Sequence, residues 1–600
     1  MPFGAELRPA GGVRFALWAP SCPEVALEIV DREGECAERW PMQRSDDGWH
    51  RCVRDDAGPG TRYRYDVGQG RVVPDPASRF NPLGVHGPSE VVDPGAHTWR
   101  DGAWSGLPWH RAAVYELHVG SFTPAGTLHA AAARLPYLYD LGIRAVELMP
   151  LAAFAGRRGW GYDGVLPFAV HPAYGSPREL KRFVDAAHRQ GLMVLLDVVH
   201  NHFGPEGNYL HGYCPEFRDD QRRTPWGAAL RLDGRDGRTV RQFFIDNALY
   251  WVEEYRFDGL RLDAVHAMHD RSGEHLVEEI AAALRDGPGR ERQVHLVLEN
   301  DDNRARWLAR DAHGKPRVAT AQWNDDWHHA ARVVATGEGQ GYYRDHVDAP
   351  VLQLACALAE GFVYQGQPSM YRGGRPRGEA SAGLTPLAFV AFLQNHDQVG
   401  NRALGERLDA LAGTARVELL LACLLLSPQV PMLFMGEEFA ARSPFLYFCD
   451  FSGALAAAVT RGRRLEFADP RDAAGGAHIP DPNAKATFAA SKLRWDERDT
   501  ERGRRRLALV RQLLALRRQH LEPRLPLQRH GGRYRCDGRS FEVEWPLGPT
   551  QCWVMRASFG GSDGPWPLAS GEREIYRVDG MDGTPSADAL RVTLRSGGEA

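Results

Sequence analysis

Apolar runs recur along residues 113–439, and stretches with helical spacing separate them. Eight of the runs are strand-like: AVYELHVGSF, RAVELMPL, LMVLLDVVHNH, FDGLRLDAVH, VHLVLEND, RVATAQW, LAFVAFLQNHD and VPMLFMGEEF. Near-continuous apolar strands that alternate with amphipathic helices are typical of parallel sheets covered by helices. Eight such units close most economically into an α/β fold, a (β/α)8 TIM barrel.

The segment SPRELKRFVDAAHRQG at 176–191 illustrates the helical stretches. Ser176 and Glu179 match a capping box, a proline occupies the first turn, and Gly191 follows the last turn. The apolar residues between them keep helical spacing. An open doubly wound sheet is the alternative, but no glycine-rich turn opens a helix after the first strand.

The chain on either side of this region has a different pattern. Short runs such as VRFALWA and TRYRYDV, separated by Gly, Pro and Asp, predict an N-terminal β-sandwich at 1–105. After the helix RRLALVRQLLALRRQ, the runs GRSFEVEWPL, TQCWVMRASF and ALRVTLRS predict a small antiparallel β domain at 522–600. The catalytic barrel is therefore predicted to span 106–521.

Composition narrows the possible partners. The chain has 600 residues and a formal net charge of -4, which favours neither a nucleic-acid nor a membrane partner. Its nine cysteines show no regular spacing, and the N-terminus lacks an export signal, so we expect a cytoplasmic protein with reduced thiols. The oligomeric state is not predicted.

Polar residues gather at the C-terminal ends of five of the eight predicted strands. These clusters are Asp197 to His202, Arg261 to His266, Glu299 to Asp302, Asn324 to Asp326, and Asn395 to Asp397. In a TIM barrel the C-terminal ends of the strands form the catalytic rim. The sequence therefore predicts an active site built from several strand ends.

Arg261 and Asp263 lie two positions apart in the apolar run GLRLDAVH. Because side chains alternate along a strand, both should point to the same face, into the barrel. A neighbouring guanidinium favours the ionised carboxylate that a nucleophile requires. Glu299 and Asp397 end two other strands, and acids placed in this way suit glycoside chemistry, with one carboxylate attacking and another protonating the leaving oxygen.

The motifs DVVHNH, GLRLDAVH, LVLEN and FLQNHD resemble, in order, the four short sequence regions of the α-amylase superfamily, glycoside hydrolase family 13. The resemblance implies that Asp263 is the nucleophile, Glu299 the general acid/base and Asp397 the stabiliser of the transition state. It further implies substrate-site roles for Arg261, His202, His396, Tyr162, Asp197 and His266. The N-terminal FALWAP resembles the carbohydrate-binding-like module that precedes the barrel in several members.

Four longer stretches, WGYDGV, NHFGPEGNYL, TAQWNDDWHHA and FLQNHDQVGNRALGERL, resemble one trehalose-releasing subfamily. That resemblance implies a retaining hydrolase of maltooligosyltrehalose and related α-glucans, which cleaves the α-1,4 bond next to the terminal trehalose unit. His266 and Ala267 replace the Lys-His of many amylases, which argues against simple starch digestion. A glycogen branching enzyme with the same acids is the alternative, and a glucan-binding protein with an inactive barrel is another.

Recognition of the trehalose end is predicted on the rim stretch 322–328. The candidate residues are Trp323, Asn324, Asp325, Asp326 and Trp327, which combine aromatic faces with partners for sugar hydroxyls. No cofactor and no required metal are expected. His200 and His202 match the metal pair of amidohydrolase barrels, but the lysine or further histidines expected on later strands are missing. Asn201 matches a calcium position of many α-amylases, without recognisable accompanying loops.

Overall fold

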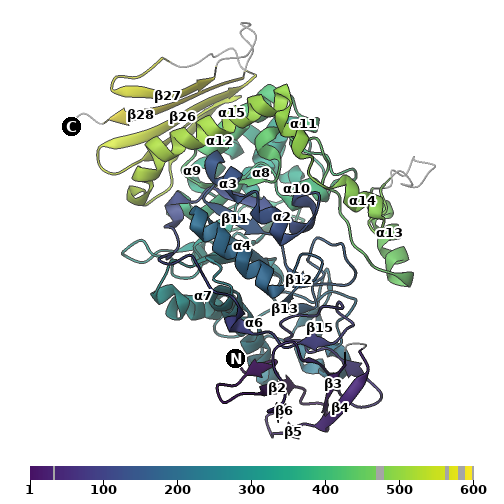
Figure 1. The fold of residues 1–600 in the computed structure, drawn as a ribbon. Helices are drawn as coiled ribbons and strands as arrows, with labels where there is room; N and C mark the ends of the chain where they lie inside the picture. The colour runs from purple at the N-terminus through teal and green to yellow at the C-terminus, as the bar shows by residue number, and fades with distance from the viewer. Residues whose placement is uncertain (32–33, 468–478, 561–566, 579–587, 597–600) are drawn as a thin grey trace.

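The computed structural model describes the chain except for residues 32–33, 468–478, 561–566, 579–587 and 597–600. Three units lie in a row, with the N-terminal sheets at one end, a central barrel and a C-terminal sheet at the other end (Figure 1). Within the described residues, no helix combines the length and the apolar character needed to cross a membrane.

The central unit is a closed barrel of parallel strands. In order around the ring these are β10 (Val114–Leu117), β11 (Ala145–Leu148), β14 (Met193–Val198), β17 (Gly259–Leu262), β18 (His295–Leu298), β19 (Ala321–Trp323), β22 (Phe389–Phe392) and β23 (Val430–Phe434). The last strand pairs with the first and closes the ring. Each of the eight predicted runs contains one of these strands, so the fold prediction is confirmed.

The inside of the barrel is packed with the alternate side chains that the strand period predicts. One buried cluster fills it: Trp109, Ala112, Val114, Ala145, Met193, Leu195, Val297, Ala321, Trp323, Val390, Phe392, Val430 and Met432. Asp197 and Glu299 have the same parity along their strands as Leu195 and Val297. The side chains at the rim therefore continue inward-facing rows that begin as apolar core.

Helices cover the outside of the barrel. The longer ones are α4 (Pro177–Gln190), α6 (Gly234–Glu254), α7 (Leu276–Asp286), α8 (Asp325–Thr336), α9 (Pro350–Glu360), α12 (Thr414–Leu426) and α15 (Glu501–Leu516). The capping box of α4 is present as predicted, because the Glu179 amide donates to Ser176 Oγ and the Ser176 amide donates to Glu179 Oε2. Gly191 ends the helix with a φ of 83°, which glycine adopts without strain.

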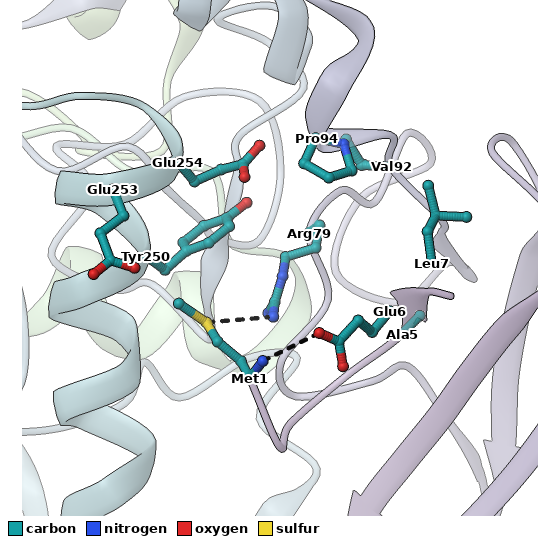
Figure 2. Close-up of a pocket in the computed structure, with 10 residues that line it drawn as sticks. All are labelled: Met1, Ala5, Glu6, Leu7, Arg79, Val92, Pro94, Tyr250, Glu253 and Glu254. Carbon is teal, nitrogen blue, oxygen red and sulfur yellow. Dashed lines mark hydrogen bonds and ion pairs between the residues drawn. The ribbon is translucent and has the colours of Figure 1, made fainter. Parts of the chain in front are cut away.

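The N-terminal unit consists of two antiparallel sheets. One contains β1 (Glu6–Leu7), β2 (Val13–Trp18), β6 (Trp49–Arg54) and β5 (Gln43–Arg44), and the other is built mainly from β4 (Cys36–Pro41), β3 (Ala26–Val30) and β7 (Arg62–Asp66). This unit packs on α6. Figure 2 shows the junction, where the Arg79 guanidinium lies 4.7 Å from the centre of the Tyr250 ring beside a pocket of about 330 Å³.

The C-terminal unit is one antiparallel sheet in the order β24-β25-β26-β28-β27. The sequence predicted β25 (Ser540–Pro546), β26 (Gln551–Phe559) and β28 (Asp588–Ser596), but not β24 (Arg533–Asp537) or β27 (Glu572–Val578). The two missed strands are the edges of the sheet. Edge strands rich in charged residues resist pairing with other chains, and this charge removes the apolar signal of a strand.

The C-terminal sheet packs on the barrel through two buried tryptophans. Trp553 Nε1 donates to the Leu426 carbonyl of α12 at 2.9 Å, and Trp545 Nε1 donates to the Leu358 carbonyl of α9 at 3.3 Å. Both rings are fully buried. The last barrel helices and the C-terminal sheet therefore share one core.

Trp553→Ala should lower the free energy of unfolding by about 3 to 5 kcal/mol, because it leaves a cavity and an unpaired carbonyl at this contact. Urea-induced unfolding, followed by circular dichroism, measures the change. Trp40→Ala is the control, since Trp40 is 37% exposed, and it should have a much smaller effect. Equal losses for the two variants would show that the contact with α12 does not hold the sheet.

Candidate active site

Arg261 of β17 lies at the centre of the barrel rim and is fully buried. Its Nη1 donates to Asp197 Oδ2 at 2.8 Å and to Asp263 Oδ1 at 2.7 Å, and its Nη2 lies 3.1 Å from Glu299 Oε2. The face of the Trp323 ring lies 4.1 Å from the guanidinium carbon. One buried cation thus holds three carboxyl groups from three neighbouring strands.

Asp263 follows β17 and is the best stabilised of these carboxylates. Besides Arg261, it accepts a hydrogen bond on Oδ2 from Asn201 Nδ2 at 2.8 Å. Burial alone would raise its pKa, but Arg261, the Asn201 bond and His202 outweigh burial and lower the pKa below the ordinary value. Asp263 is therefore ionised at neutral pH.

Glu299 follows β18 and has the opposite electrostatic environment. Burial raises the pKa of Glu299 well above its ordinary value, and Asp263 and Asp397 raise it further, against the opposing effect of Arg261. The Ala264 amide donates to Glu299 Oε2 at 2.7 Å. Ala264 reaches this position with a left-handed backbone, φ 41°, which is strained for a residue with a side chain.

Asp397 lies in the first turn of the short helix α10 (His396–Gly400), after β22. Its side chain is 37% exposed, and Oδ2 lies 3.4 Å from His396 Nε2. His396 Nδ1 contacts Glu116 Oε1 of β10 at 2.5 Å. Burial opposes a charge on His396, but Asp397 and Glu116 raise its pKa to about 9, so the ring is a cation at neutral pH.

Tyr162 and His202 form the walls beside the acids. The Tyr162 hydroxyl donates to Asp197 Oδ2 at 2.6 Å, and its ring stacks on His396 with centroids 5.0 Å apart. Burial raises the pKa of Asp197 to about 6. His202 hydrogen-bonds Asn201 and stacks on Trp226, an exposed ring in the hairpin of β15 (Arg218–Thr224) and β16 (Gly227–Leu230).

His266 lies in the short turn after β17 (Val265–Ala267), and Asp325 is the first residue of α8. His266 Nδ1 accepts a hydrogen bond from the Asp301 amide at 3.3 Å, and burial lowers the pKa of the His266 ring. Burial and the charge of Asp301 raise the pKa of Asp325 to about 7. The charge of Asp325 in turn contributes to the raised pKa of Glu299.

Three residues predicted for the trehalose pocket, Asn324, Asp326 and Trp327, pack into the core, whereas Trp323 lies inside the barrel beneath Arg261. Asn324 caps α8 through the Trp327 amide, and its Nδ2 donates to the Gly361 carbonyl at 2.8 Å. Asp326 and Trp327 are fully buried, and so is Trp323 beneath Arg261. The chain turns into α8 directly after β19, so most of these side chains enter the core instead of the rim.

Several residues of the site were not among the predicted ones. They are Asn201, Glu116, Ala264, Trp226 and Tyr342, whose hydroxyl donates to Gln398 Oε1 at 3.1 Å. Glu116 gives the same signal as Arg261, a charge inside an apolar run, and Asn201 lies within DVVHNH. Trp226 and Tyr342 lie in long connections between barrel strands. Such connections have no regular alternation of apolar and polar residues from which the direction of a side chain could be predicted.

The described residues contain one cluster with the geometry of metal ligands, formed by Asp326, His329 and His346. The Asp326 carboxylate already accepts hydrogen bonds from Arg377, from Asn303 and from two backbone amides. A guanidinium 2.6 Å from this carboxylate disfavours a cation, so we assign no metal to the cluster.

The metal pair considered for the third strand is not formed. His200 turns away from His202, and its Nε2 pairs with Asn247 Oδ1 at 2.8 Å. The remaining groups at the rim combine an ionised and a protonated carboxyl group on one guanidinium. That combination suits nucleophilic attack together with proton donation.

Comparisons with known proteins extend this picture. Residues 93–223 match the family model of the α-amylase catalytic domain, and residues 2–79 match carbohydrate-binding module 48, the isoamylase N-terminal domain. A malto-oligosyltrehalose trehalohydrolase of Deinococcus radiodurans is 42% identical over 86% of this chain and 83% of its own length. A branching enzyme of Photobacterium profundum is 35% identical, but over only 45% of this chain and 40% of its own length.

The fold is similar to that of solved structures. A Salmonella typhimurium protein, provisionally named an alpha amylase, superposes with a TM-score of 0.91 at 45% identity, covering 99% of each chain. A pullulanase from Anoxybacillus superposes with a TM-score of 0.69 at 18% identity, covering 99% of this chain and 87% of its own. The second likeness concerns the fold alone.

Asp325→Asn should lower the pKa of Glu299, because it removes the negative charge that Asp325 carries above about pH 7 and that favours the protonated form of Glu299. Glu299 should then lose its proton at a lower pH than in the parent protein. The 13C chemical shift of its carboxyl carbon, assigned with Glu299→Gln, reports the titration. Asp286→Asn is the control, since the Asp286 side chain is 60% exposed on the surface. An unchanged or raised midpoint in Asp325→Asn would contradict the assigned electrostatics.

Proposed function

We propose that this chain, which belongs to the malto-oligosyltrehalose trehalohydrolase family, hydrolyses the α-1,4-glucosidic bond next to the terminal trehalose unit of malto-oligosyltrehalose. The products are trehalose and a shortened maltooligosaccharide. The observation that carries the chemistry is the pair of carboxyl groups on Arg261, with Asp263 ionised and Glu299 protonated. One guanidinium that contacts both groups keeps them close. A retaining mechanism requires two carboxyl groups about 5 to 5.5 Å apart.

In the first step, Asp263 attacks the anomeric carbon of the glucosyl unit that precedes trehalose. Glu299 gives its proton to the glycosidic oxygen, so the bond to trehalose breaks and trehalose leaves with a hydroxyl group. Asp263 is then joined to the maltooligosaccharide as an ester. Negative charge on Asp397 stabilises the positive charge that develops on the sugar ring in the transition state.

In the second step, Glu299 is ionised and acts as a base toward a water molecule. The water attacks the anomeric carbon, its proton goes to Glu299, and the ester bond to Asp263 breaks. Two inversions restore the α configuration. Arg261 favours the free carboxylate of Asp263 throughout, which makes Asp263 a competent leaving group.

Binding of the substrate uses the walls around the acids. Tyr162 and Trp226 offer aromatic faces for sugar rings, and His202 and His396 offer ring nitrogens to hydroxyl groups. Asp325 is the member of the stretch 322–328 that stays a proposed partner of the trehalose end. Its half-buried carboxyl, whose charge acts on Glu299, suits a hydroxyl group of the leaving unit.

We propose a cytoplasmic site of action. All nine cysteines lie in the described parts of the chain, and none is in a disulfide, which supports a reducing compartment.

Product analysis tests the proposed function. Incubation with malto-oligosyltrehalose should release free trehalose, and the new reducing end of the maltooligosaccharide should appear first as the α-anomer in proton NMR. A plain maltooligosaccharide of equal length is the control substrate and should be cleaved far more slowly. New α-1,6 branches without free trehalose would instead identify a branching enzyme, and an initial β-anomer would exclude attack by Asp263.

Asp263→Asn should lower kcat by several powers of ten, because the amide keeps the volume and the Asn201 bond but cannot form the ester. Asp286→Asn is the surface control. The thermal unfolding of both variants should stay near that of the parent, which separates lost chemistry from lost folding. Near-normal turnover of Asp263→Asn would refute the assignment of the nucleophile.

A further inference from the structure

A second concave site lies outside the barrel, between residues 96–100 and α4. It is a cavity of about 350 Å³ lined by His97, Arg100, Arg178, Arg182, Asp185 and Arg189, among others. Helix α4 belongs to the outer layer of the barrel (Figure 1). The cavity is therefore separate from the carboxylates at the rim.

Three arginines of this cavity have no anionic partner among the residues that the structure describes. The side chains of Arg100, Arg178 and Arg182 are exposed and make no hydrogen bond or ion pair with any described residue. The chain as a whole carries 77 acidic against 73 basic side chains, so a shortage of carboxylates does not explain this. The positive charge of these three arginines is therefore not paired with a carboxylate in the described part of the chain.

Two of these arginines lie at positions where they destabilise α4 unless an anion is bound nearby. Arg178 is the second residue of α4, and Arg182 follows one turn later. Like charges four residues apart repel, and the start of a helix disfavours positive charge. An anion in the cavity would relieve both effects.

His97 supplies an independent sign of a ligand. Its side chain is 8% exposed, yet its Nε2 has no hydrogen-bond partner within the described ranges. Asp185 does not fill this role, because its Oδ2 lies 4.0 Å from His97 Nε2. The Asp185 carboxylate instead accepts a hydrogen bond from the Arg100 amide at 2.7 Å and lies 3.8 Å from Arg189 Nε.

We propose that this cavity, called the arginine pocket, binds the phosphate group of a small phosphorylated metabolite such as a sugar phosphate. Guanidinium groups match the oxygens of a phosphate dianion and form charge-assisted hydrogen bonds to it. His97 Nε2–H offers a further donor from the buried side of the pocket. The volume lies in the range of small-molecule sites and leaves room for a sugar ring beside the phosphate.

Isothermal titration calorimetry with the full-length protein tests the proposal, at constant ionic strength because exposed charges are screened by salt. The probes are inorganic phosphate, a hexose phosphate and the neutral hexose. We expect saturable binding of the phosphate-bearing probes and no heat from the neutral hexose. Tighter binding of the hexose phosphate identifies a sugar phosphate as the ligand, and equal binding identifies free phosphate.

The double variant Arg178→Gln with Arg182→Gln should weaken this binding roughly tenfold or more. Arg511→Gln is the matched control, since Arg511 is also an exposed helix arginine without a partner among the described residues. Absence of saturable binding by either phosphate probe up to about 10 mM overturns the proposal. Equal affinities of the double variant and the parent also overturn it.

Discussion

The buried guanidinium of Arg261 is the interaction on which the rest of the active site depends. A charge taken out of water is unfavourable unless partners surround it, and Arg261 meets this condition with three carboxyl groups and the face of Trp323. Those partners come from adjacent strands of the barrel. The geometry of the rim is therefore fixed by an electrostatic requirement in addition to the packing of the strands.

The same arrangement gives different pKa values to the two carboxyl groups that perform the chemistry. Both contact Arg261, but Asp263 has the extra Asn201 donor, whereas Glu299 is surrounded by other acids. Two carboxyl groups thus have different pKa values because their neighbours differ. A second chain of charges, Glu116, His396 and Asp397, alternates in sign across the opposite side of the rim.

Sequence patterns predicted the barrel well because apolar strands and helical spacing are local signals. The inward direction of Arg261 and Asp263 also followed from strand alternation. Strand alternation could not predict the side-chain directions in the stretch 322–328, because α8 begins within it and a helix does not keep that alternation. The contacts of Glu116 and of Tyr342 join distant parts of the chain, so no local pattern contains them.

The bond between Glu116 and His396 joins residues 280 positions apart, across the seam where the last strands of the ring meet the first. During synthesis the first strand therefore leaves the ribosome long before its partner exists. Until β22 and β23 arrive, the acids of the early strands lack the histidine cation and the ring is open. Such a long-range closure is slow to form, and an incomplete chain exposes unpaired strand edges meanwhile. The catalytic charges therefore come together late in folding, when the barrel closes.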